Sequence, residues 1–487
     1  MSTVDKSTTA SASILHETVK ENRFVTPLSL LTTIMIFMSF WYVEHSWDAS
    51  EFAYLSQESY TGEANLTADR LSQVNPASAI FRLAIAGWGC LCFLLAPKFQ
   101  IRLSSPLLWG LVTVGLFLMF SVLWSINTSH TIFKLAVFGS MVVAALGIAS
   151  ALSIREILTT ATIVCLSFIG IGIVSEIAFG NFRILGDYRF IGTTHPNTEA
   201  IYASIICLTA RMFLSSSGKL NYIAIVFFFF GMIMVWLTKS RTTLAGLLLS
   251  LLIIQAISLR GSNRILMIST LVVMLSLGLA GFTLISQSSS GTLGSVATMG
   301  RKDDVSTLSG RLPLWEELVD SISKRPLIGH GYLAYWDAKR VEYLSETFRW
   351  EIPHGHNLYL DTMLDIGILG LVVVIFTIFA AMYQALVLYW KTNRIEYSIT
   401  FGLFIYAMSN GFAESIFKLP NFPLFLVLTC SFSMLFERLP LPVGNAVREA
   451  LSHPSRIRRG NESEALQSES RSQIRPYPKP IKRPNLR

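Results

Sequence analysis

The amino-acid sequence predicts an all-α protein: a polytopic bundle of about twelve transmembrane helices, with one large external loop that contains short amphipathic helices. Two observations lead to this fold class. Only 14% of the 487 residues are charged and 52% are hydrophobic, whereas a soluble domain carries roughly a quarter charged residues. The charges are also clustered, and they leave apolar runs of about 20 residues that can cross the hydrocarbon core. Inside lipid such a run must be helical, because no water satisfies its backbone.

The predicted spans follow one another with short polar turns between them. They cover residues 24–43, 78–97, 106–125, 131–151, 156–178, 197–214, 220–238, 242–259, 264–285, 366–390, 397–413 and 420–436. A long polar lead precedes the first span, and no small-residue cleavage site follows that span, so the lead is not a signal peptide. A basic, proline-rich tail follows the last span and is expected to be disordered. Five parts result, with boundaries at 1–23, 24–285, 286–356, 357–437 and 438–487.

The distribution of lysine and arginine predicts the orientation in the membrane. These residues gather in alternate turns, for example at Arg155 and Arg260, and in the lead and the tail, so that side is cytoplasmic. An even number of spans places both termini there, and the large loop 286–356 then lies on the external face. The net charge of +8 follows from this bias. It indicates a bilayer with anionic lipids as the partner, and no nucleic acid.

Cysteine and histidine show no recognisable disulfide or metal pattern. All five cysteines lie inside apolar runs and are interpreted as small buried side chains: Cys90, Cys92, Cys165, Cys207 and Cys430. Three of the eight histidines, His330, His354 and His356, lie in the large loop. Neither a carboxylate nor a second histidine stands at helical ligand spacing from them, so no metal site is predicted.

The large loop contains one clear amphipathic helix. It starts near Ser309 or Gly310 and ends at Lys324 and Arg325, where the helix dipole favours cations. Its apolar residues recur at helical spacing: Leu312, Trp315, Leu318, Val319 and Ile322. The helix is expected to lie at the membrane surface with Trp315 at the interface.

Glycine-rich, polar and aromatic segments fill the rest of the loop. A glycine-punctuated turn at 325–331 contains His330, and the segment 353–357 contains His354 and His356 directly before an apolar run. Aromatic residues in this loop can stack on sugar rings or anchor the loop at the interface: Trp315, Tyr332, Tyr335, Trp336 and Trp350. Both interpretations stay open here, with anchoring preferred for Trp315.

Two shorter external segments add cations and a histidine to the same face. One follows the fifth predicted span and contains Arg189 and His195; the other separates the seventh and eighth spans and contains Lys239 and Arg241. Lys239 and Arg241 lie outside against the positive-inside bias, which points to a function. The structural alternative is that a neighbouring hydroxyl caps the next helix, with Arg241 as a snorkelling anchor. His195 would then open an ordinary helix start.

Ionisable residues in the middle of the membrane would indicate transport, because they line ion and substrate pathways. Glu176, Glu199 and Asp365 instead lie near the predicted external ends of their spans, and Lys134 and Glu414 are also close to span ends. No repeated halves are evident. The charge distribution therefore favours chemistry at the external surface over translocation.

Several short motifs resemble the superfamily of O-antigen ligases and Wzy-type polysaccharide polymerases, which are bacterial inner-membrane glycosyltransferases. The motifs are GRLPLW at 310–315, PLIGHG at 326–331, HNLYL at 356–360 and GILG at 367–370, with HPN at 195–197 and SR at 240–241. The layout, about a dozen spans with one large periplasmic loop before the last few, is similar as well. The motif wording is closest to the branch that polymerises exopolysaccharide.

The resemblance implies roles for the external cations and histidines. The family's essential arginine and histidine correspond to Arg311 and His356, the candidate catalytic residues, although His354 two positions earlier leaves the choice of histidine open. The candidate substrate-binding residues are Arg241, Arg189, His195, His330 and His354.

The resemblance also implies the reaction: undecaprenyl-pyrophosphate-linked repeat units are joined into exopolysaccharide at the periplasmic face of the inner membrane. Guanidinium groups would bind the pyrophosphate, and a histidine would take the proton of the acceptor hydroxyl. Neither a metal nor another cofactor is expected. Chain-length and export proteins of the polysaccharide pathway are candidate partners. The alternatives are an O-antigen ligase that transfers glycan to lipid A-core, a transporter or flippase, and a scaffold of an export complex.

Overall fold

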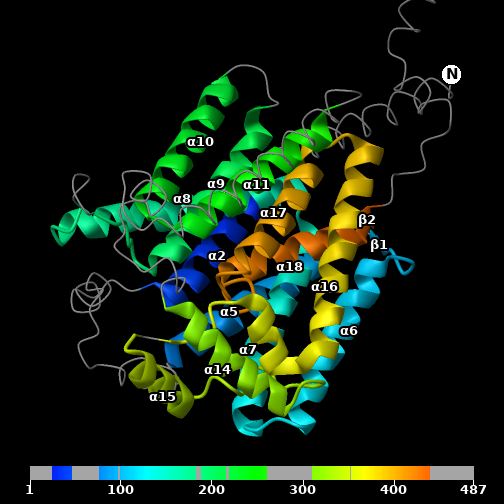
Figure 1. Ribbon diagram of the computed structural model, residues 1–487. Helices are drawn as coiled ribbons and strands as arrows, with labels where there is room; N and C mark the ends of the chain where they lie inside the picture. The colour runs from blue at the N-terminus through cyan, green and yellow to red at the C-terminus, as the bar shows by residue number, and fades with distance from the viewer. Residues whose placement is uncertain are drawn as a thin grey trace, which may run out of the picture. The chain divides into compact units, whose positions relative to one another are not determined.

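Helices make up nearly all the regular structure of the protein, as its apolar runs predict (Figure 1). The computed structural model describes residues 25–45, 76–96, 99–182, 188–214, 219–259, 310–350 and 352–438. The helices are α2 (Pro27–Glu44), α5 (Pro76–Leu95), α6 (Pro106–Phe120), the 3-10 turn η1 (Ser121–Leu123), α7 (Thr128–Ala151), α8 (Ile154–Ala178), α9 (Pro196–Leu214), α10 (Lys219–Leu237), α11 (Arg241–Ser258), α14 (Arg311–Lys324), α15 (Ala338–Phe348), α16 (Leu358–Thr392), α17 (Ile395–Asn410) and α18 (Phe422–Leu435). Two short strands, β1 (Phe99–Ile101) and β2 (Phe436–Arg438), pair antiparallel.

Within the described residues, seven helices are long and apolar enough to cross a membrane. They are α2, α5, α6 together with η1, α7, α8, α11 and α16, and shorter apolar helices lie within α10 and at α18. The predicted all-α membrane fold is therefore confirmed. The count of about twelve spans stays a prediction. The span expected at 264–285 lies outside the described residues, as do the lead and the tail.

The surfaces of these helices are apolar, and several bury polar groups between them. Leu83, Phe229 and Val372 are 70%, 60% and 58% exposed, an arrangement that suits lipid and not water. Inside the bundle, the Glu44 carboxylate accepts hydrogen bonds from the Tyr202 hydroxyl (2.9 Å) and from the backbone at the start of α18 (2.8 Å). Such buried polar bonds hold membrane helices together where hydrophobic burial gives no driving force.

Helix α16 is broken at Gly367, and the glycine-rich turn at 326–331 completes the broken backbone. Gly367 has φ 67° and ψ −173°, which interrupts the helix. The hydrogen bonds across the break run from His330 N–H to Leu364 O (2.6 Å), from Gly331 N–H to Asp365 O (2.9 Å) and from Ile368 N–H to Pro326 O (2.8 Å). A broken helix is tolerated at membrane depth only where protein satisfies the freed backbone groups. The motifs at 326–331 and 367–370 therefore contact each other, and this contact determines the path of α16.

Helices α14 and α15 pack over the first part of α16 with an apolar core of their own. This core contains Leu314, Leu318, Ile322, Tyr335, Trp336, Val341, Leu344, Ile352 and Leu364. The predicted apolar face of α14 is right for Leu318 and Ile322 but wrong for Leu312 and Val319, which are 39% and 53% exposed. The reason is that the buried face follows Leu314, Leu318 and Ile322 at intervals of four residues, which leaves the other two off the contact.

The aromatic residues of this region pack within the protein. Tyr332, Tyr335 and Trp336 are only 3%, 2% and 4% exposed, so the interpretation that they stack on sugars is wrong. Trp315 is half-buried and donates from Nε1 to the Gly355 carbonyl at 2.9 Å, so its role is not confined to anchoring at the interface. Trp350 is half-buried, and its ring centroid lies 5.3 Å from that of His356.

Candidate active site

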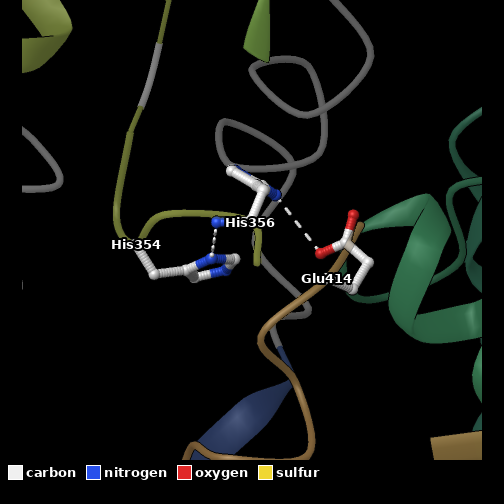
Figure 2. A group of neighbouring side chains, drawn as sticks. All are labelled: His354, His356 and Glu414. Atoms are coloured by element: carbon white, nitrogen blue, oxygen red, sulfur yellow. Dashed lines mark hydrogen bonds and ion pairs between the residues drawn. The ribbon is translucent and has the colours of Figure 1, made fainter. Parts of the chain in front are cut away.

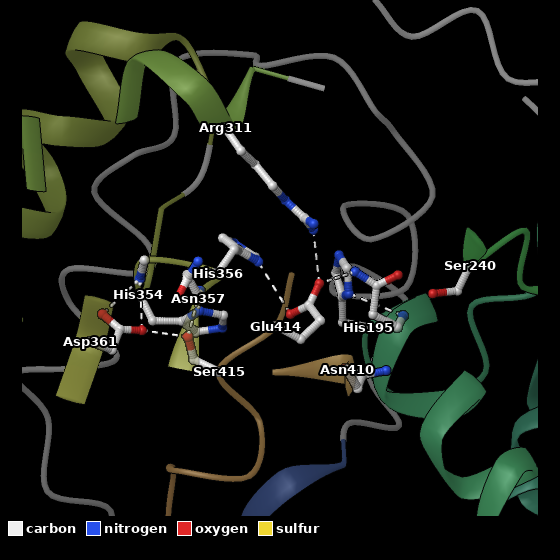
Figure 3. Close-up of polar contacts among 12 residues, drawn as sticks. His195, Ser240, Arg311, His354, His356, Asn357, Asp361, Asn410, Glu414 and Ser415 are labelled. Carbon is white, nitrogen blue, oxygen red and sulfur yellow. Dashed lines mark hydrogen bonds and ion pairs between the residues drawn. The ribbon is translucent and has the colours of Figure 1, made fainter. Parts of the chain in front are cut away.

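Glu414 lies at the centre of a polar cluster built from segments that are far apart in the sequence (Figure 3). It occupies the turn between α17 and α18 and is 2% exposed. Its Oε1 accepts from Nη2 of Arg311, the first residue of α14, at 2.8 Å, and also from Nδ2 of Asn197 in the first turn of α9. Its Oε2 lies 3.2 Å from Nδ1 of His356, which precedes α16. One buried carboxylate thus joins the two candidate catalytic residues.

His356 has a backbone conformation that is rare for its residue type. Its φ of 47° lies in the left-handed region, which costs free energy for residues other than glycine. Its backbone N–H donates to Nδ1 of His354 at 3.2 Å, and the two rings lie 4.2 Å apart (Figure 2). Its Nε2 is buried and has no hydrogen-bond partner among the described residues. Strained residues with an unpaired polar atom gather at functional sites.

The charges around Glu414 keep its carboxylate ionised. Burial alone raises the pKa of Glu414, but the charge and hydrogen bond of His356 and the guanidinium of Arg311 outweigh burial and lower this pKa below its ordinary value. An ionised carboxylate only accepts, so Nδ1 of His356 donates to it; when the ring is neutral, Nε2 is then the nitrogen that can take up a proton. Burial, and then the neighbouring His356, lower the pKa of His354, which agrees with a neutral ring that accepts at Nδ1.

Two buried glutamates hold the segment that contains Arg189 and His195. Glu176 of α8 accepts from the N–H groups of Ile191 (2.8 Å) and Gly192 (2.9 Å), and Glu199 of α9 accepts from the N–H of Thr193 (3.2 Å) and the hydroxyl of Thr194 (3.0 Å). Arg189 donates from Nε to the carbonyl of Thr238 at 3.0 Å. His195 lies within electrostatic reach of Arg189 and of the Glu414 cluster. The segment 189–195 is therefore brought to the site and fixed there.

The segment before α11 lies next to the segment that contains Arg189, because the Phe190 N–H donates to the Leu237 carbonyl at 2.9 Å. Lys239 has a left-handed φ of 52°, and Ser240 is buried. Figure 3 draws Ser240 together with His195 and Glu414. Ser240 stands at the N-cap position of α11, but its side chain makes no capping bond and donates to the Thr243 hydroxyl at 3.0 Å. Arg241 is the first residue of α11 and is half-buried. Capping by Ser240 therefore does not explain this motif.

His330 lies apart from the Glu414 cluster. Its Nε2 is 3.1 Å from the Ser321 carbonyl of α14, and its ring packs 5.5 Å from that of Tyr335. Burial lowers the pKa of His330, which favours the neutral ring that donates to this carbonyl. These contacts fasten the turn 326–331 to α14, and a role in substrate binding stays a prediction.

A cation site is also compatible with three of these residues. His354, His356 and Glu414 each offer one ligand atom, and these atoms lie within 4.8 Å of one another. The sequence contained no ligand spacing because Glu414 stands 58 positions after His356. However, the Glu414 carboxylate already contacts the Arg311 guanidinium, and a fixed positive charge beside a carboxylate opposes a second cation there. Arg311 therefore already provides one positive charge at this carboxylate.

An apolar cavity of about 160 Å³ opens beside the cluster. Its lining includes Leu358, two positions after His356, and Phe417, three positions after Glu414. Further apolar side chains come from α6, α7, α16, α17 and α18, and Asp365 and Lys418 contribute polar groups joined by an ion pair of 2.8 Å. A cavity of this lining accepts an apolar chain next to a charged site.

Sequence reasoning missed Glu414 and Asn197 as members of the site. The sequence shows Glu414 as a charged residue near the end of a span and Asn197 as part of the HPN motif, and neither is predicted to belong to the site. Their pairing bridges 217 positions, and that of Glu414 with Arg311 bridges 103. The one signal in the sequence is an acidic residue on a face with several external cations.

Comparison with known proteins finds similarity over part of the chain. Residues 224–375 match the model of a family described as O-antigen ligase. The chain is 29% identical over 119 residues to the exopolysaccharide production protein ExoQ of Rhizobium meliloti (strain 1021). That match covers 22% of this chain and 26% of the relative, so the chain matches about a quarter of the relative's length. These findings confirm the resemblance to the superfamily of O-antigen ligases and Wzy-type polymerases.

Proposed function

We propose that this chain is a membrane glycosyltransferase that joins undecaprenyl-pyrophosphate-linked repeat units into exopolysaccharide at the periplasmic face of the bacterial inner membrane. The family match and the resemblance to an exopolysaccharide production protein support a glycan polymerase or ligase. The observation that carries the proposal is the Glu414 cluster, in which one buried carboxylate holds both Arg311 and His356. It brings a phosphate-binding group and a proton acceptor to one place.

His356 is the proposed general base. An acceptor hydroxyl attacks the anomeric carbon of the donor sugar, a glycosidic bond forms, and the bond from that carbon to the pyrophosphate oxygen breaks. Nε2 of His356 takes the hydroxyl proton, while Glu414 stabilises the resulting imidazolium through Nδ1. This orientation, with one nitrogen held by a carboxylate and the other directed at the substrate, is the arrangement of a histidine base in other transferases and hydrolases. Such a base contributes roughly 10²–10⁴-fold to the rate.

Arg311 is the proposed partner of the leaving group. The departing undecaprenyl pyrophosphate retains the electron pair of the broken bond, and this charge needs cations. A guanidinium has five N–H donors in a fixed fork, and Arg311 contacts Glu414 through its Nη2. Arg189 and Arg241, on the two neighbouring segments, are the proposed additional phosphate-binding residues. Because these side chains supply the positive charge, the proposal includes no metal or other cofactor.

A lipid-linked substrate is supported by the apolar cavity beside the cluster. Leu358 and Phe417 connect it directly to the turns that carry His356 and Glu414. A substrate with a polar pyrophosphate and an apolar tail would place the former at Arg311 and part of the latter among these side chains. Chain-length and export proteins of the polysaccharide pathway are proposed partners of the whole enzyme.

Ligation is the second candidate. The description of the matching family names an O-antigen ligase, and the same cluster would serve transfer of a finished glycan to lipid A-core. The name of the relative favours polymerisation, so we place that first. A transporter or flippase comes third, because Arg311, His356 and Glu414 form one cluster beside α14 and the turn between α17 and α18.

A complementation experiment separates these functions. The chromosomal gene is deleted and replaced by the wild type or by Arg311→Ala, with equal membrane levels as the control, and lipid-linked glycans are extracted with the polymer. Polymerisation predicts that Arg311→Ala loses polymer while single lipid-linked repeats accumulate in the periplasmic leaflet. Long lipid-linked polymer that never reaches lipid A would indicate a ligase. Repeats that stay in the cytoplasmic leaflet, or full complementation by the variant, would contradict the enzyme.

A further inference from the structure

Asp361, in the first turn of α16, accepts hydrogen bonds from three parts of the site and is 1% exposed. Its Oδ1 accepts from Nε1 of Trp336 at 2.9 Å. Both carboxylate oxygens accept from the backbone N–H of Gly355, at 3.2 and 3.1 Å. Its Oδ2 also accepts from the hydroxyl of Ser415. Trp336, Gly355 and Ser415 thus all donate to the Asp361 carboxylate, and none of these three residues belongs to the cluster around Glu414.

These contacts lie immediately beside the two residues of the proposed base. Gly355 directly precedes His356, and Ser415 directly follows Glu414. The Ser415 hydroxyl also accepts from the backbone N–H of Asn357 at 3.0 Å, so the His356 turn is held on both sides (Figure 3). Asp361 thus links the turn that contains His356, the proposed base, to the turn that contains Glu414.

The local backbone shows why such a tie is needed. His356 is held at a φ of 47°, a strained conformation that persists only where neighbours enforce it. Gly355 runs so close to Asp361 that a Cβ at position 355 would lie 2.8 Å from Oδ1. Nε1 of the Trp315 indole also donates to the Gly355 carbonyl, at 2.9 Å. The carboxylate and the indole together fix the peptide units before His356.

We propose that Asp361 is a positioning residue: its carboxylate sets the contact between His356 and Glu414 by fastening Gly355 and Ser415 to one point. This proposal rests on the proposed function, in which that contact orients the base. An ionised carboxylate is suited to the position because it only accepts, and all three groups that face it donate. An amide of the same shape would turn an N–H₂ group toward at least one of these donors.

The test compares Asp361→Asn with the wild type as purified full-length protein acting on a lipid-linked oligosaccharide. We expect kcat to fall on the order of 10²-fold, because a small displacement of a catalytic group is enough for such a loss, while KM stays within about twofold. Ser415→Ala should lower kcat in the same direction, and the double variant should be no worse than Asp361→Asn alone, since both act through one tie. The matched control is Asp320→Asn, which removes an exposed carboxylate of α14 that pairs only with Lys324 at 2.8 Å.

A second readout does not depend on any glycan chemistry. Histidine modification by diethyl pyrocarbonate in membranes, followed by mass spectrometry, should be several-fold faster at His356 in Asp361→Asn than in the wild type. His130, at the start of α7, is the internal reference and should not change. If the folded Asp361→Asn protein keeps wild-type kcat and wild-type reactivity of His356, the proposal is overturned, however low its yield. If the wild type transfers no glycan but the change in reactivity appears, the proposed function fails and the positioning role stands.

Discussion

His356 combines three features that rarely meet in one side chain. Its backbone is left-handed, its Nδ1 lies 3.2 Å from a buried carboxylate, and its Nε2 is buried without a hydrogen-bond partner among the described residues. The strained backbone and the unpartnered Nε2 each cost free energy in a protein that only needs to fold. Together they indicate that His356 is held in this conformation so that its Nε2 faces the substrate.

Substitution of His356 should separate chemistry from folding. Asparagine tolerates the left-handed conformation better than most residues, so His356→Asn should insert and fold as the wild type does. Loss of the base should still lower the rate roughly 10²–10⁴-fold. The measurement is polymer yield at matched membrane levels, with His130→Asn as the control, because His130 lies at the start of α7, outside the Glu414 cluster. Wild-type polymer from His356→Asn would show that another group is the base.

Glu414 should give stability a characteristic dependence on pH. Its pKa is lowered in the folded protein from an ordinary value of 4.5, so its contribution is complete above that value and is lost as the pH falls below it. The difference in Tm between the wild type and Glu414→Gln should therefore shrink as the pH falls below about 4.5. Thermal unfolding in detergent between about pH 5 and 3 measures it. A difference that grows over this acidic range would contradict an ionised, paired Glu414.

At the scale of elements, the course of α16 decides where the site can form. The turn 326–331 replaces helical hydrogen bonds at the Gly367 break, and α14 is fastened to the same turn through His330. This places Arg311, at the start of α14, next to the N-terminus of α16 and the His356 turn. The order of elements around the break thus brings motifs that are far apart in the sequence together in one cluster.

The break at Gly367 should not tolerate a side chain. A Cβ there would lie 2.2 Å from the Leu327 carbonyl, and the φ of 67° alone costs an alanine about 1–3 kcal/mol. Gly367→Ala should therefore lower Tm by several degrees, and it should lower activity by displacing the turn. Gly139→Ala in α7, where nothing lies within 4 Å, is the control and should change Tm little. Equal Tm values for the two variants would contradict the described contact.

The sequence predicted elements far better than contacts. Apolar length located the helices to within a few residues, as for the span expected at 156–178 and found as α8 (Ile154–Ala178), because lipid leaves an apolar run little choice but a helix. Arg311 and His356 were identified through motifs, and the structure brings both to one carboxylate. Glu414 could not be assigned to that site, because helix packing and not sequence distance decides which turns meet. The rings of Tyr332 and Tyr335 were misread for the same reason, since burial depends on partners in other elements.

At the scale of the whole molecule, the proposed function requires the Glu414 cluster and α15 to face the periplasm. Tyr343 of α15 is 54% exposed, and Thr392 at the far end of the long helix α16 is also exposed. A cysteine at position 343 should react with a membrane-impermeant maleimide in intact cells, while one at position 392 should react only after permeabilisation. The background is Cys90→Ser, because Cys90 is the exposed cysteine among the five. The reverse labelling pattern would invert the orientation and contradict the function.

The most direct measurement is glycan transfer by the purified chain alone. Wild type and His356→Asn are reconstituted in liposomes with undecaprenyl-pyrophosphate-linked repeat units in the presence of EDTA, and lipid-linked products are separated by length. The account predicts that the wild type forms longer lipid-linked glycans and releases undecaprenyl pyrophosphate without any divalent metal, and that His356→Asn does so at most at about a hundredth of the rate. No elongation by the folded wild type, with or without added metal, would contradict the central claim.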